Sequence, residues 1–447
     1  MKNSLPVDPV FYSILCLFAG CFTAPSFENF VILTAGWVLC VKRKTVTGMI
    51  EAAGVADTTH HERFHRFFSK ACWPLDELSR ILLTTLVARF VPSGQPIRLG
   101  GDDTLAKKTG RKIFGTGRWR DAVLSTKAVV VTRWGLNFVV LSLTLSLPLW
   151  PNRTLGFPFM ARLHRKEKAF EDPSQYRTLS QLLVEMIILV AGWLPDRTFH
   201  LAVDGAYANE ILLKGLPSNV VLISRTRTDA TLYELAPPRT GKRGAPRKKG
   251  DKLPKPRQLA VSSTVTWTPV KVTLYGAERD LEVYSFVGLW YHVAKGRALK
   301  FVLVRDPKDP TDWLCLFSTD LTLSVIAILE TMGGRWSIEV AFREAKQSLG
   351  AEHPQSRLPK AVERQFPLGL MLVSLVKLWF VTHGHQTRFA VMSCGPWNRT
   401  KIEPSFSDML AALRRAGWAQ RISSNSASDA ELRKILEALI DQLAQAA

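Results

Sequence analysis

Cysteines are scarce in this sequence, and their spacing argues against the common thiol-based sites. The 447 residues include six cysteines, none of them in a CxxC pair, and structural zinc sites are built from such closely spaced thiols. Most of the six lie in apolar surroundings. We therefore interpret them as buried free thiols of a protein from a reducing compartment, where disulfides do not persist.

The usual membrane and export signals are missing as well. The apolar stretch at residues 11–22 is shorter than the roughly 20 residues that a membrane span needs. It follows Asp8 and Pro9 rather than a basic cluster, and no clear small-residue cleavage site comes after it. We find neither a basic amphipathic helix nor a lipidation signal. The stretch is predicted to be a buried helix, and no membrane partner is expected.

Acidic residues are too few to balance the basic ones. The chain has 38 Asp and Glu against 59 Lys and Arg, which gives a formal net charge of +21. A charge of this size creates a positive field around the protein and favours a polyanionic partner. Because the membrane signals are missing, nucleic acid is the predicted partner.

Residues 1–92 are predicted to form a helical N-terminal domain. Apolar residues recur at helical spacing in residues 75–90. The basic run Lys42-Arg43-Lys44 leads into a helix that Gly54 ends, and another helix follows. Such a junction is a candidate DNA-binding helix-turn-helix, although a plain helical bundle explains it equally well.

Strand and helix patterns alternate from residue 93 onward and predict an α/β fold. Three strands, a helix, a strand, a short helix and a strand follow one another, at residues 97–99, 127–133, 136–147, 178–194, 199–203, 208–214 and 220–224. This order is typical of an RNase H-like catalytic core. We assign residues 93–227 and 331–382 to the two parts of that core, and residues 383–447 to a helical C-terminal tail.

The two parts of the core are separated by a β-rich insertion at residues 228–330. Its first part, residues 239–257, is rich in Pro, Gly and basic residues and is predicted to be a mobile basic arm. Such an arm can bind DNA phosphates without reading sequence, and a solvated linker is the alternative. The candidate DNA contacts in the arm are Arg243, Arg247, Lys248 and Lys249.

Two aspartates follow apolar strands of the predicted core. Asp102 comes after residues 97–99, and Asp204 comes after residues 199–203. Carboxylates at strand ends meet at one edge of a sheet, where they can bind hard cations such as Mg²⁺. A single strand-end aspartate is more often a helix cap, but two in this order, in a basic chain, favour a metal site.

A third carboxylate is predicted on a helix that begins near Arg335. At about 100° per residue, Arg335, Glu339, Phe342 and Lys346 lie within an arc of roughly 60°, whereas Glu344 lies opposite Arg335. One face of the helix would therefore carry a carboxylate between two cations. An exposed helix with ordinary i,i+4 ion pairs is the alternative interpretation.

These segments together resemble a known family, the insertion-sequence DDE transposases with a Tyr–Arg–Glu–Lys signature and a β-strand insertion before the glutamate. The resemblance is carried by residues 102–104, 203–207 and 333–346 and spans roughly residues 30–380, with residues 107–115 and 317–320 in support. Arg335, Glu339 and Lys346 match the Arg, Glu and Lys of the signature. Met332 stands where the family has Tyr, so this sequence departs from the pattern there.

The resemblance implies metal-dependent cleavage at transposon ends, followed by attack of the freed 3′-OH on target DNA. It implies that Asp102, Asp204 and Glu339 bind two Mg²⁺ ions, for which Mn²⁺ can substitute, and that Arg335 and Lys346 hold the DNA beside the scissile phosphate. The implied partners are the terminal inverted repeats and target DNA, together with further copies of this chain in a homodimer or higher multimer. The implied location is the bacterial cytoplasm, at the nucleoid.

Two assignments within this resemblance have competitors. Asp103 competes with Asp102 for the first metal position, and Asp102 is favoured because the family's first aspartate is followed by any residue and then Thr or Ser. Trp290 is the candidate for a tryptophan in the insertion that stacks on a flipped base. Trp267 is its competitor, and a buried core position is the alternative for either ring.

Two other functions stay open at this point. The chain could be a catalytically inactive DNA-binding protein or repressor derived from a transposase, as the Met332 departure allows. It could also be an RNase H-like nuclease that cuts DNA without joining it.

Overall fold

Helices form the N-terminal part of the protein, as predicted for residues 1–92. They are α1 (Pro9–Cys16), the short 3-10 helix η1 (Ala19–Cys21), α2 (Ala24–Leu39), α3 (Val46–Ala52), α4 (Glu62–Ser69) and α5 (Leu75–Phe90). The computed structural model describes residues 7–121, 124–126, 128–238, 245–393, 400–424 and 436. Of the stretch predicted to be a buried helix, residues 11–16 lie in α1, and Phe11 and Leu15 are buried.

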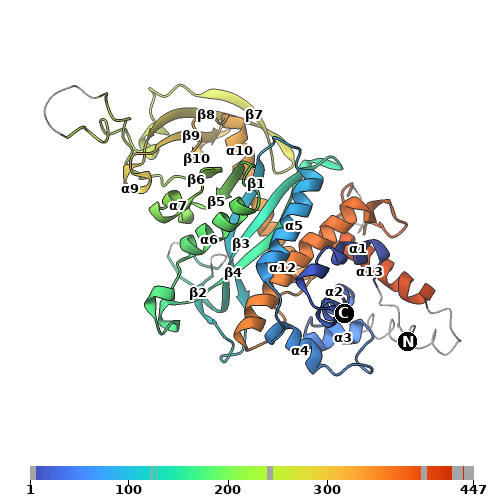
Figure 1. Cartoon of the computed structure of the whole chain (residues 1–447). Helices are drawn as coiled ribbons and strands as arrows, with labels where there is room; N and C mark the ends of the chain where they lie inside the picture. Colours follow the sequence, from blue (N-terminus) through green and yellow to red (C-terminus); the bar gives the residue numbers. More distant parts are fainter. Residues whose placement is uncertain are drawn as a thin grey trace.

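A mixed sheet of ten strands runs through the middle of the described part of the chain (Figure 1). Its core strands are β1 (Ile97–Lys107), β2 (Gly117–Arg120), β3 (Thr132–Leu147), β4 (Trp150–His164), β5 (Phe199–Val203) and β6 (Val220–Arg225). β4, β3 and β1 are antiparallel neighbours, and β1, β5 and β6 are parallel neighbours. This is the strand arrangement of an RNase H-like core, so the predicted fold class is confirmed.

Short helices connect the core strands and cover one face of the sheet. They are η2 (Glu167–Ala169), η3 (Pro173–Gln175), α6 (Leu179–Trp193), η4 (Gly205–Tyr207) and α7 (Glu210–Gly215). A capping box starts α6: the Thr178 side chain accepts a hydrogen bond from the Gln181 N–H, and the Gln181 side chain accepts one from the Thr178 N–H. Leu183 of α6 lies against Gly101 of β1, whereas Ile338 lies against the neighbouring Gly100, so α6 packs on the face opposite the helix that carries Ile338.

The insertion continues the same sheet instead of forming a separate layer. After α8 (Pro256–Leu259) come β7 (Thr268–Leu274), β8 (Ala277–Leu289), α9 (Tyr291–Ala294), β9 (Ala298–Asp306) and β10 (Asp309–Ser318). β10 pairs with core strand β6, and β9, β8 and β7 extend the sheet outward from it (Figure 1). The insertion is therefore held to the core by backbone hydrogen bonds.

A run of helices brings the chain back across the core. It consists of α10 (Val325–Gly334), α11 (Trp336–Arg343), the π-helical turn η5 (Glu344–Ser348), α12 (Pro359–Thr382), η6 (Gly384–Gln386) and α13 (Phe406–Ser424). Helical structure thus begins ten residues before Arg335, the predicted start. α11 packs closely on β4, since a Cβ atom on Gly156 would lie 2.4 Å from the Ser337 carbonyl oxygen.

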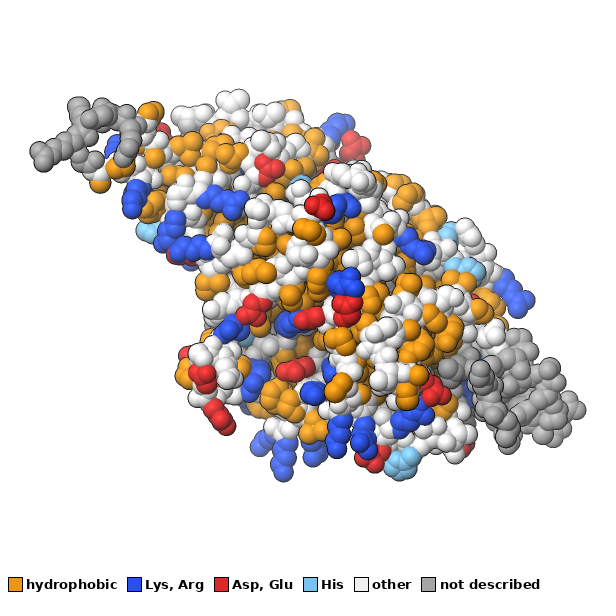
Figure 2. Space-filling model, viewed as in Figure 1, with side chains coloured by type: hydrophobic (Ala, Val, Ile, Leu, Met, Phe, Trp, Pro, Cys, Tyr) orange, Lys and Arg blue, Asp and Glu red, His pale blue; other side chains and the backbone are white. Residues whose placement is uncertain are grey.

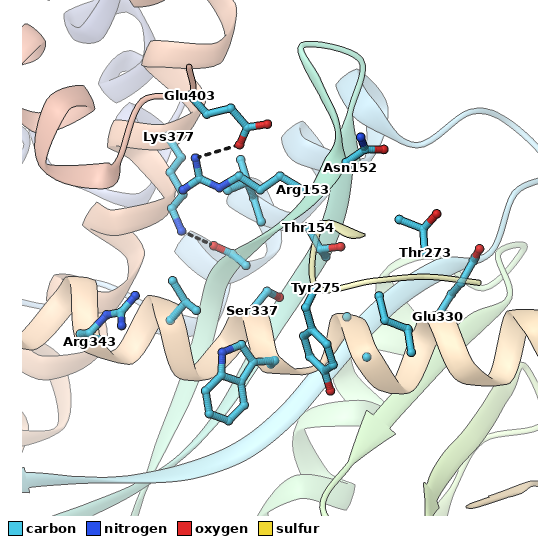
Figure 3. A pocket seen from close by; sticks show the side chains of 18 residues that line it. Asn152, Arg153, Thr154, Thr273, Tyr275, Glu330, Ser337, Arg343, Lys377 and Glu403 are labelled. Carbon is cyan, nitrogen blue, oxygen red and sulfur yellow. Dashed lines mark hydrogen bonds and ion pairs between the residues drawn. The ribbon is translucent and has the colours of Figure 1, made fainter. Parts of the chain in front are cut away.

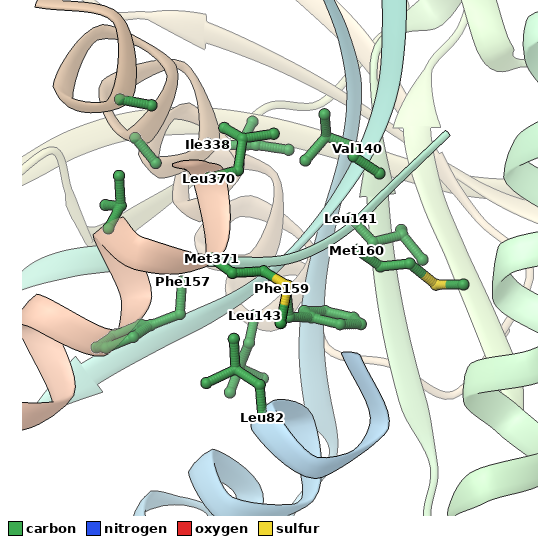
Figure 4. Close-up of a cluster of buried hydrophobic side chains, with 14 of the residues drawn as sticks. Leu82, Val140, Leu141, Leu143, Phe157, Phe159, Met160, Ile338, Leu370 and Met371 are labelled. Atoms are coloured by element: carbon green, nitrogen blue, oxygen red, sulfur yellow. The ribbon is translucent and has the colours of Figure 1, made fainter. Parts of the chain in front are cut away.

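α12 is the central helix of the hydrophobic core. It is long and apolar enough to cross a membrane, but 94% of its most apolar window is buried inside the protein. It packs on β4 and on the N-terminal helices, and the indole of Trp379 donates a hydrogen bond to Asp8 at 2.8 Å. Figure 4 shows Met371 of α12 beside Phe159 of β4, and Leu370 beside Ile338. One core thus joins the N-terminal helices to the catalytic sheet.

Candidate active site

Asp102 and Asp204 follow the last pair of residues that joins two parallel strands. Gly101 of β1 is paired with Val203 of β5, and the two aspartates come next in each strand. β1 continues past this point, whereas β5 ends and Asp204 caps η4, accepting a hydrogen bond from the Ala206 N–H at 3.5 Å. The sheet therefore places two carboxylates side by side, although they are far apart in the sequence.

Arg335 connects Asp102 to Glu339 of α11. Its Nη1 donates to Asp102 Oδ2 at 2.6 Å, and its Nη2 donates to Glu339 Oε1 at 2.8 Å. The side chains of Arg335 and Asp102 are 9% and 18% exposed, whereas that of Glu339 is 32% exposed, so the cluster opens to solvent on the helix side. The predicted face of Arg335 and Glu339 is thus turned toward the first aspartate.

Negative charge exceeds positive charge in this cluster. The pKa of Asp102 is raised to about 7, chiefly by burial and also by the nearby charges of Asp103 and Glu339, while Arg335 opposes the shift. The charge of Asp204 also acts on Arg335 and on Asp103. Three carboxylates, Asp102, Glu339 and Asp204, therefore act on one guanidinium, and a surplus of oxygen ligands of this kind suits a hard divalent cation.

The three predicted ligands do not enclose a single point in this conformation. Among the described residues, no three His, Cys, Asp or Glu side chains are close enough to hold one ion together. The guanidinium of Arg335 lies between Asp102 and Glu339. The donor chemistry fits Mg²⁺, and the binding geometry requires Arg335 to move from between the two carboxylates.

Asp103 points to the opposite face of β1 from Asp102, because side chains alternate along a strand. Its two oxygens accept hydrogen bonds from the Tyr207 hydroxyl and the Asn137 side-chain amide, each at 3.1 Å. Burial raises the pKa of Asp103, and these two bonds oppose the shift. Asp103 therefore positions Tyr207 and η4, and Asp102 is the aspartate that faces Glu339.

Lys346 lies in the π-helical turn and reaches β1 two residues beyond Asp102. Its Nζ donates to Thr104 Oγ1 and to the Leu105 carbonyl, both at 2.8 Å, and lies 3.9 Å from Glu352. Burial lowers the pKa of Lys346, and Glu352 partly offsets this. Lys346 is thus tied to β1 two residues beyond Asp102, and its nearest carboxylate is Glu352.

Trp290 does not lie on the surface, as a base-stacking ring would. It is 5% exposed, begins α9, and packs edge-on against Phe317 with ring centroids 5.8 Å apart. The backbone N–H and C=O of Leu289 both form hydrogen bonds with the backbone of Tyr233, and these two bonds hold the turn in the core. A base could stack on the ring only after the ring left the core. Its competitor Trp267 packs under the guanidinium of Arg305 at 4.0 Å.

The basic arm is described from residue 245 onward, and Arg243 lies outside the described residues. Arg247 and Lys248 are exposed, and Arg247 forms an ion pair with Asp251 at 3.0 Å. The Lys249 ammonium lies 3.8 Å from the centre of the Tyr233 ring. This part of the arm therefore packs against the end of the insertion, while its cations stay accessible to solvent.

A cavity of about 610 Å³ lies along the outer side of α10 and α11 (Figure 3). Sequence analysis missed it because its walls come from separate elements: Arg153 of β4, Tyr275 of the β7–β8 turn, and Trp336 and Arg343 of α11. Trp336 and Tyr275 are 52% and 68% exposed. The signal for Trp336 was available, since it directly follows Arg335, but the helical projection considered only the charged face.

Comparison with known proteins gives the family. The profile described as DDE superfamily endonuclease matches residues 17–279, more than half of the chain; the match includes Asp102 and Asp204 and ends before Glu339. No curated protein matches the sequence. A solved structure, the piggyBac transposase synaptic complex with hairpin DNA, is similar over 98% of this chain and 82% of that chain, with 10% identity and a TM-score of 0.41, which is too low to indicate a shared function. From the profile match, this chain belongs to the DDE superfamily endonucleases.

Proposed function

We propose that this endonuclease is a DNA transposase, which cleaves DNA at transposon ends and transfers the 3′-OH into target DNA. The observation that carries the proposal is the cluster of Asp102, Asp204 and Glu339, two from adjacent parallel strands and one from α11. The net charge of +21 supports DNA as the substrate.

Asp102, Asp204 and Glu339 are the residues that would hold two Mg²⁺ ions, with Mn²⁺ able to substitute. Their carboxylate oxygens are the ligands that Mg²⁺ prefers, and the surplus negative charge around Asp102 supports the assignment. Such ions, when bound, stabilise the charge on the attacking and leaving oxygens of a phosphoryl displacement.

Arg335 and Lys346 have different parts in this proposal. Arg335 neutralises Asp102 and Glu339 in the conformation described here and, once released from them, is placed to contact the DNA strand beside the scissile phosphate. Lys346 keeps α11 aligned with β1 through Thr104 and Leu105 and adds positive charge next to the cut. A bidentate guanidinium matches a phosphate better than an ammonium does.

The proposed partners are the terminal inverted repeats, target DNA and other copies of this chain. A transposon has two ends, so coordinated excision requires at least two active sites in one assembly. We propose a homodimer or a higher multimer bound to DNA in the bacterial cytoplasm, at the nucleoid.

The test is a cleavage and joining assay with duplex DNA that carries the repeats flanking the protein's own gene. Purified protein is incubated with Mg²⁺ or with EDTA, beside the Glu339→Gln variant. Metal-dependent cleavage at the repeat ends, lost in the variant, is the expected result. A second substrate with a pre-cut 3′-OH end tests joining: cleavage without joining indicates a nuclease, and binding without cleavage under any metal indicates an inactive DNA-binding protein.

A further inference from the structure

The sheet continues past the carboxylates as a narrow ribbon. β1 pairs with β5 only as far as Gly101, but it runs on to Lys107 while paired with β3. The first residues of β3 pair in turn with β2, so that Lys107, Gly135 and Gly117 lie side by side. Three strands therefore project beyond the active site, where η5 and residues 352–354 hold the end of β1 through Lys346, Lys107 and Lys108.

The register of this ribbon decides which side chains share a face with Asp102. Side chains alternate along each strand, and paired residues point to the same face. Asp102, Thr104 and Ala106 of β1 thus lie on one face, together with Arg118 and Arg120 of β2, which are paired with Trp134 and Thr132. Trp119, between the two arginines, points to the other face.

Trp119 holds β2 in place. Its indole donates to the Gly135 carbonyl at 3.1 Å, its ring is 7% exposed, and the Lys166 ammonium lies 4.0 Å from the ring centre. Because Trp119 is fixed on one face, Arg118 and Arg120 are fixed on the other. Their direction is therefore set by the sheet and not by a flexible loop.

We name the cations on this side the basic ribbon; they are Arg111, Lys112, Arg118, Arg120 and Arg357. All five are exposed, and Arg357 joins the group because its carbonyl accepts a hydrogen bond from the Phe114 N–H. Within the described ranges, no carboxylate lies at ion-pair distance from any of the five. Figure 2 shows Lys and Arg side chains gathered along the lower edge of the molecule, where β2 and the start of α12 lie in Figure 1.

We propose that the basic ribbon binds the phosphate backbone of duplex DNA next to the scissile phosphate; this rests on the proposed function of the carboxylate site. Exposed cations that have no carboxylate partner among the described residues, two of them fixed on one face of the sheet, are suited to an anionic surface. From Asp102 to Lys107 the strand advances about 17 Å at roughly 3.3 Å per residue. At about 3.4 Å per base pair, the ribbon contacts the backbone roughly five base pairs from the cut. The contacts set the register of the DNA and read no bases.

The first experiment measures binding of a 40-base-pair duplex by fluorescence anisotropy in EDTA, over a range of salt concentrations. Each phosphate contact contributes about 0.9 to the slope of log K against log salt. The double variant R118A/R120A is expected to lower the slope by about 2 and the affinity at 0.1 M salt by about 60-fold. The variant R118K/R120K keeps both charges and is expected to restore most of the slope.

The matched control is R89A/K214A, which also removes two exposed positive charges. Arg89 precedes the start of β1 and Lys214 precedes the start of β6, at the end of the sheet away from the ribbon. Its slope is expected to equal that of the wild type. An unchanged slope in R118A/R120A, or an equal decrease in the control, would overturn the proposal.

The position of the contact is tested with single methylphosphonate substitutions, which make one phosphate neutral at a time. In the wild type, substitutions roughly five base pairs from the cleaved bond are expected to weaken binding, and in R118A/R120A they are expected to have no further effect. An effect that persists in the variant would contradict the assignment. Binding in EDTA requires no cleavage, so the two proposals are tested separately. The ribbon proposal is wrong if R118A/R120A binds like the wild type, even when the enzyme cleaves. The proposed function is wrong if the enzyme does not cleave, even when the ribbon binds DNA.

Discussion

Two glutamates in one stretch of helix meet opposite environments. Glu339 shares Arg335 with Asp102 and keeps 32% of its side chain exposed. Glu344, in the π-helical turn that follows, is 8% exposed and lies 2.6 Å from Lys377 of α12, itself 1% exposed. The same stretch of helix thus carries one acid to the edge of the sheet and the other into the core; the helical projection predicted that the two lie on opposite faces, but not that Glu344 is buried.

The difference between the two pairs is charge balance rather than burial alone. The Lys377 ammonium has one carboxylate and also donates to the Gly156 carbonyl at 2.8 Å, so the Glu344–Lys377 pair is satisfied within the protein. Around Glu339, one arginine serves three carboxylates, and the pKa of Asp102 is raised to about 7, chiefly by burial and also by its acidic neighbours. An excess of carboxylates without counter-charges indicates a site that binds an external cation, whereas a balanced ion pair indicates a structural contact.

The largest expected effect is loss of activity in Glu339→Gln. Removing a group that stabilises charge in the transition state costs about 10³-fold in rate, and here a metal-binding carboxylate is lost. Cleavage is expected to fall by at least that factor, while the free energy of unfolding changes by less than about 1 kcal/mol, because Arg335 keeps Asp102 as its partner. Cleavage rates and urea denaturation measure the two quantities.

Glu344→Gln is expected to show the reverse pattern. It leaves the Lys377 ammonium buried without a counter-charge, which costs about 3–5 kcal/mol of unfolding free energy. Cleavage per folded molecule at low temperature is expected to change little, because Glu344 faces away from the carboxylate cluster. Urea denaturation followed by circular dichroism gives the stability.

The matched control for Glu344→Gln removes both charges together. E344L/K377M replaces the pair with apolar side chains of similar size, and such replacements are often neutral or stabilising. The double variant is therefore expected to be more stable than E344Q. If both variants are equally unstable, packing rather than the uncompensated charge explains the loss.

The RNase H-like order could be predicted from the sequence because its parallel strands are short and apolar. Residues 199–203 and 220–224 correspond to β5 and β6, and each is followed by a turn. The third antiparallel strand was placed wrongly. Residues 128–131 are irregular, with the Val131 N–H donating to the Ser125 hydroxyl, whereas the strand is β4, Trp150–His164. β4 was not predicted because Pro151, Gly156 and Pro158 are untypical of a strand. Pro158 is tolerated because it lies at a β-bulge opposite β3.

The insertion shows the same limit of local patterns. Residues 261–267 are rich in β-branched residues but form no strand, whereas β10 begins with Asp309, Pro310 and Asp312, which are untypical of a strand. Helical spacing was sufficient to place Arg335, Glu339 and Lys346 on one face. It could not show that Arg335 bridges two carboxylates, because Asp102 is 233 residues away in the chain. Nor could it show that Trp290 is buried, since that depends on the packing of Phe317.

Asp408 is another buried acid, and its carboxylate accepts hydrogen bonds from several donors. Burial would raise its pKa, but bonds from Lys401, from the Ser393 N–H and from Ser405 outweigh burial and lower the pKa from 3.8 to about 2. A group whose folded pKa is depressed contributes stability above its unfolded pKa, and this stability is lost as pH falls through the folded value.

The expected contribution of Asp408 is about 2.5 kcal/mol, at about 1.4 kcal/mol per pKa unit. It is fully present above about pH 4 and disappears between pH 4 and pH 2. Asp408→Asn is therefore expected to be less stable than the wild type at pH 6 and to approach it at pH 2. Denaturant titrations at several pH values measure the difference, and a constant gap between the two proteins would contradict the assignment.

The smallest expected effect separates the two adjacent aspartates. Asp103→Asn keeps an oxygen that can accept the hydrogen bond from Tyr207, so η4 and Asp204 stay in place. We expect cleavage to fall by less than about tenfold, equivalent to about 1.4 kcal/mol in the barrier. Asp102→Asn, measured beside it, is expected to match the loss in Glu339→Gln. If the two aspartate variants lose activity equally, Asp103 also acts on the metal or the substrate, and the division of β1 into a catalytic face and a positioning face is wrong.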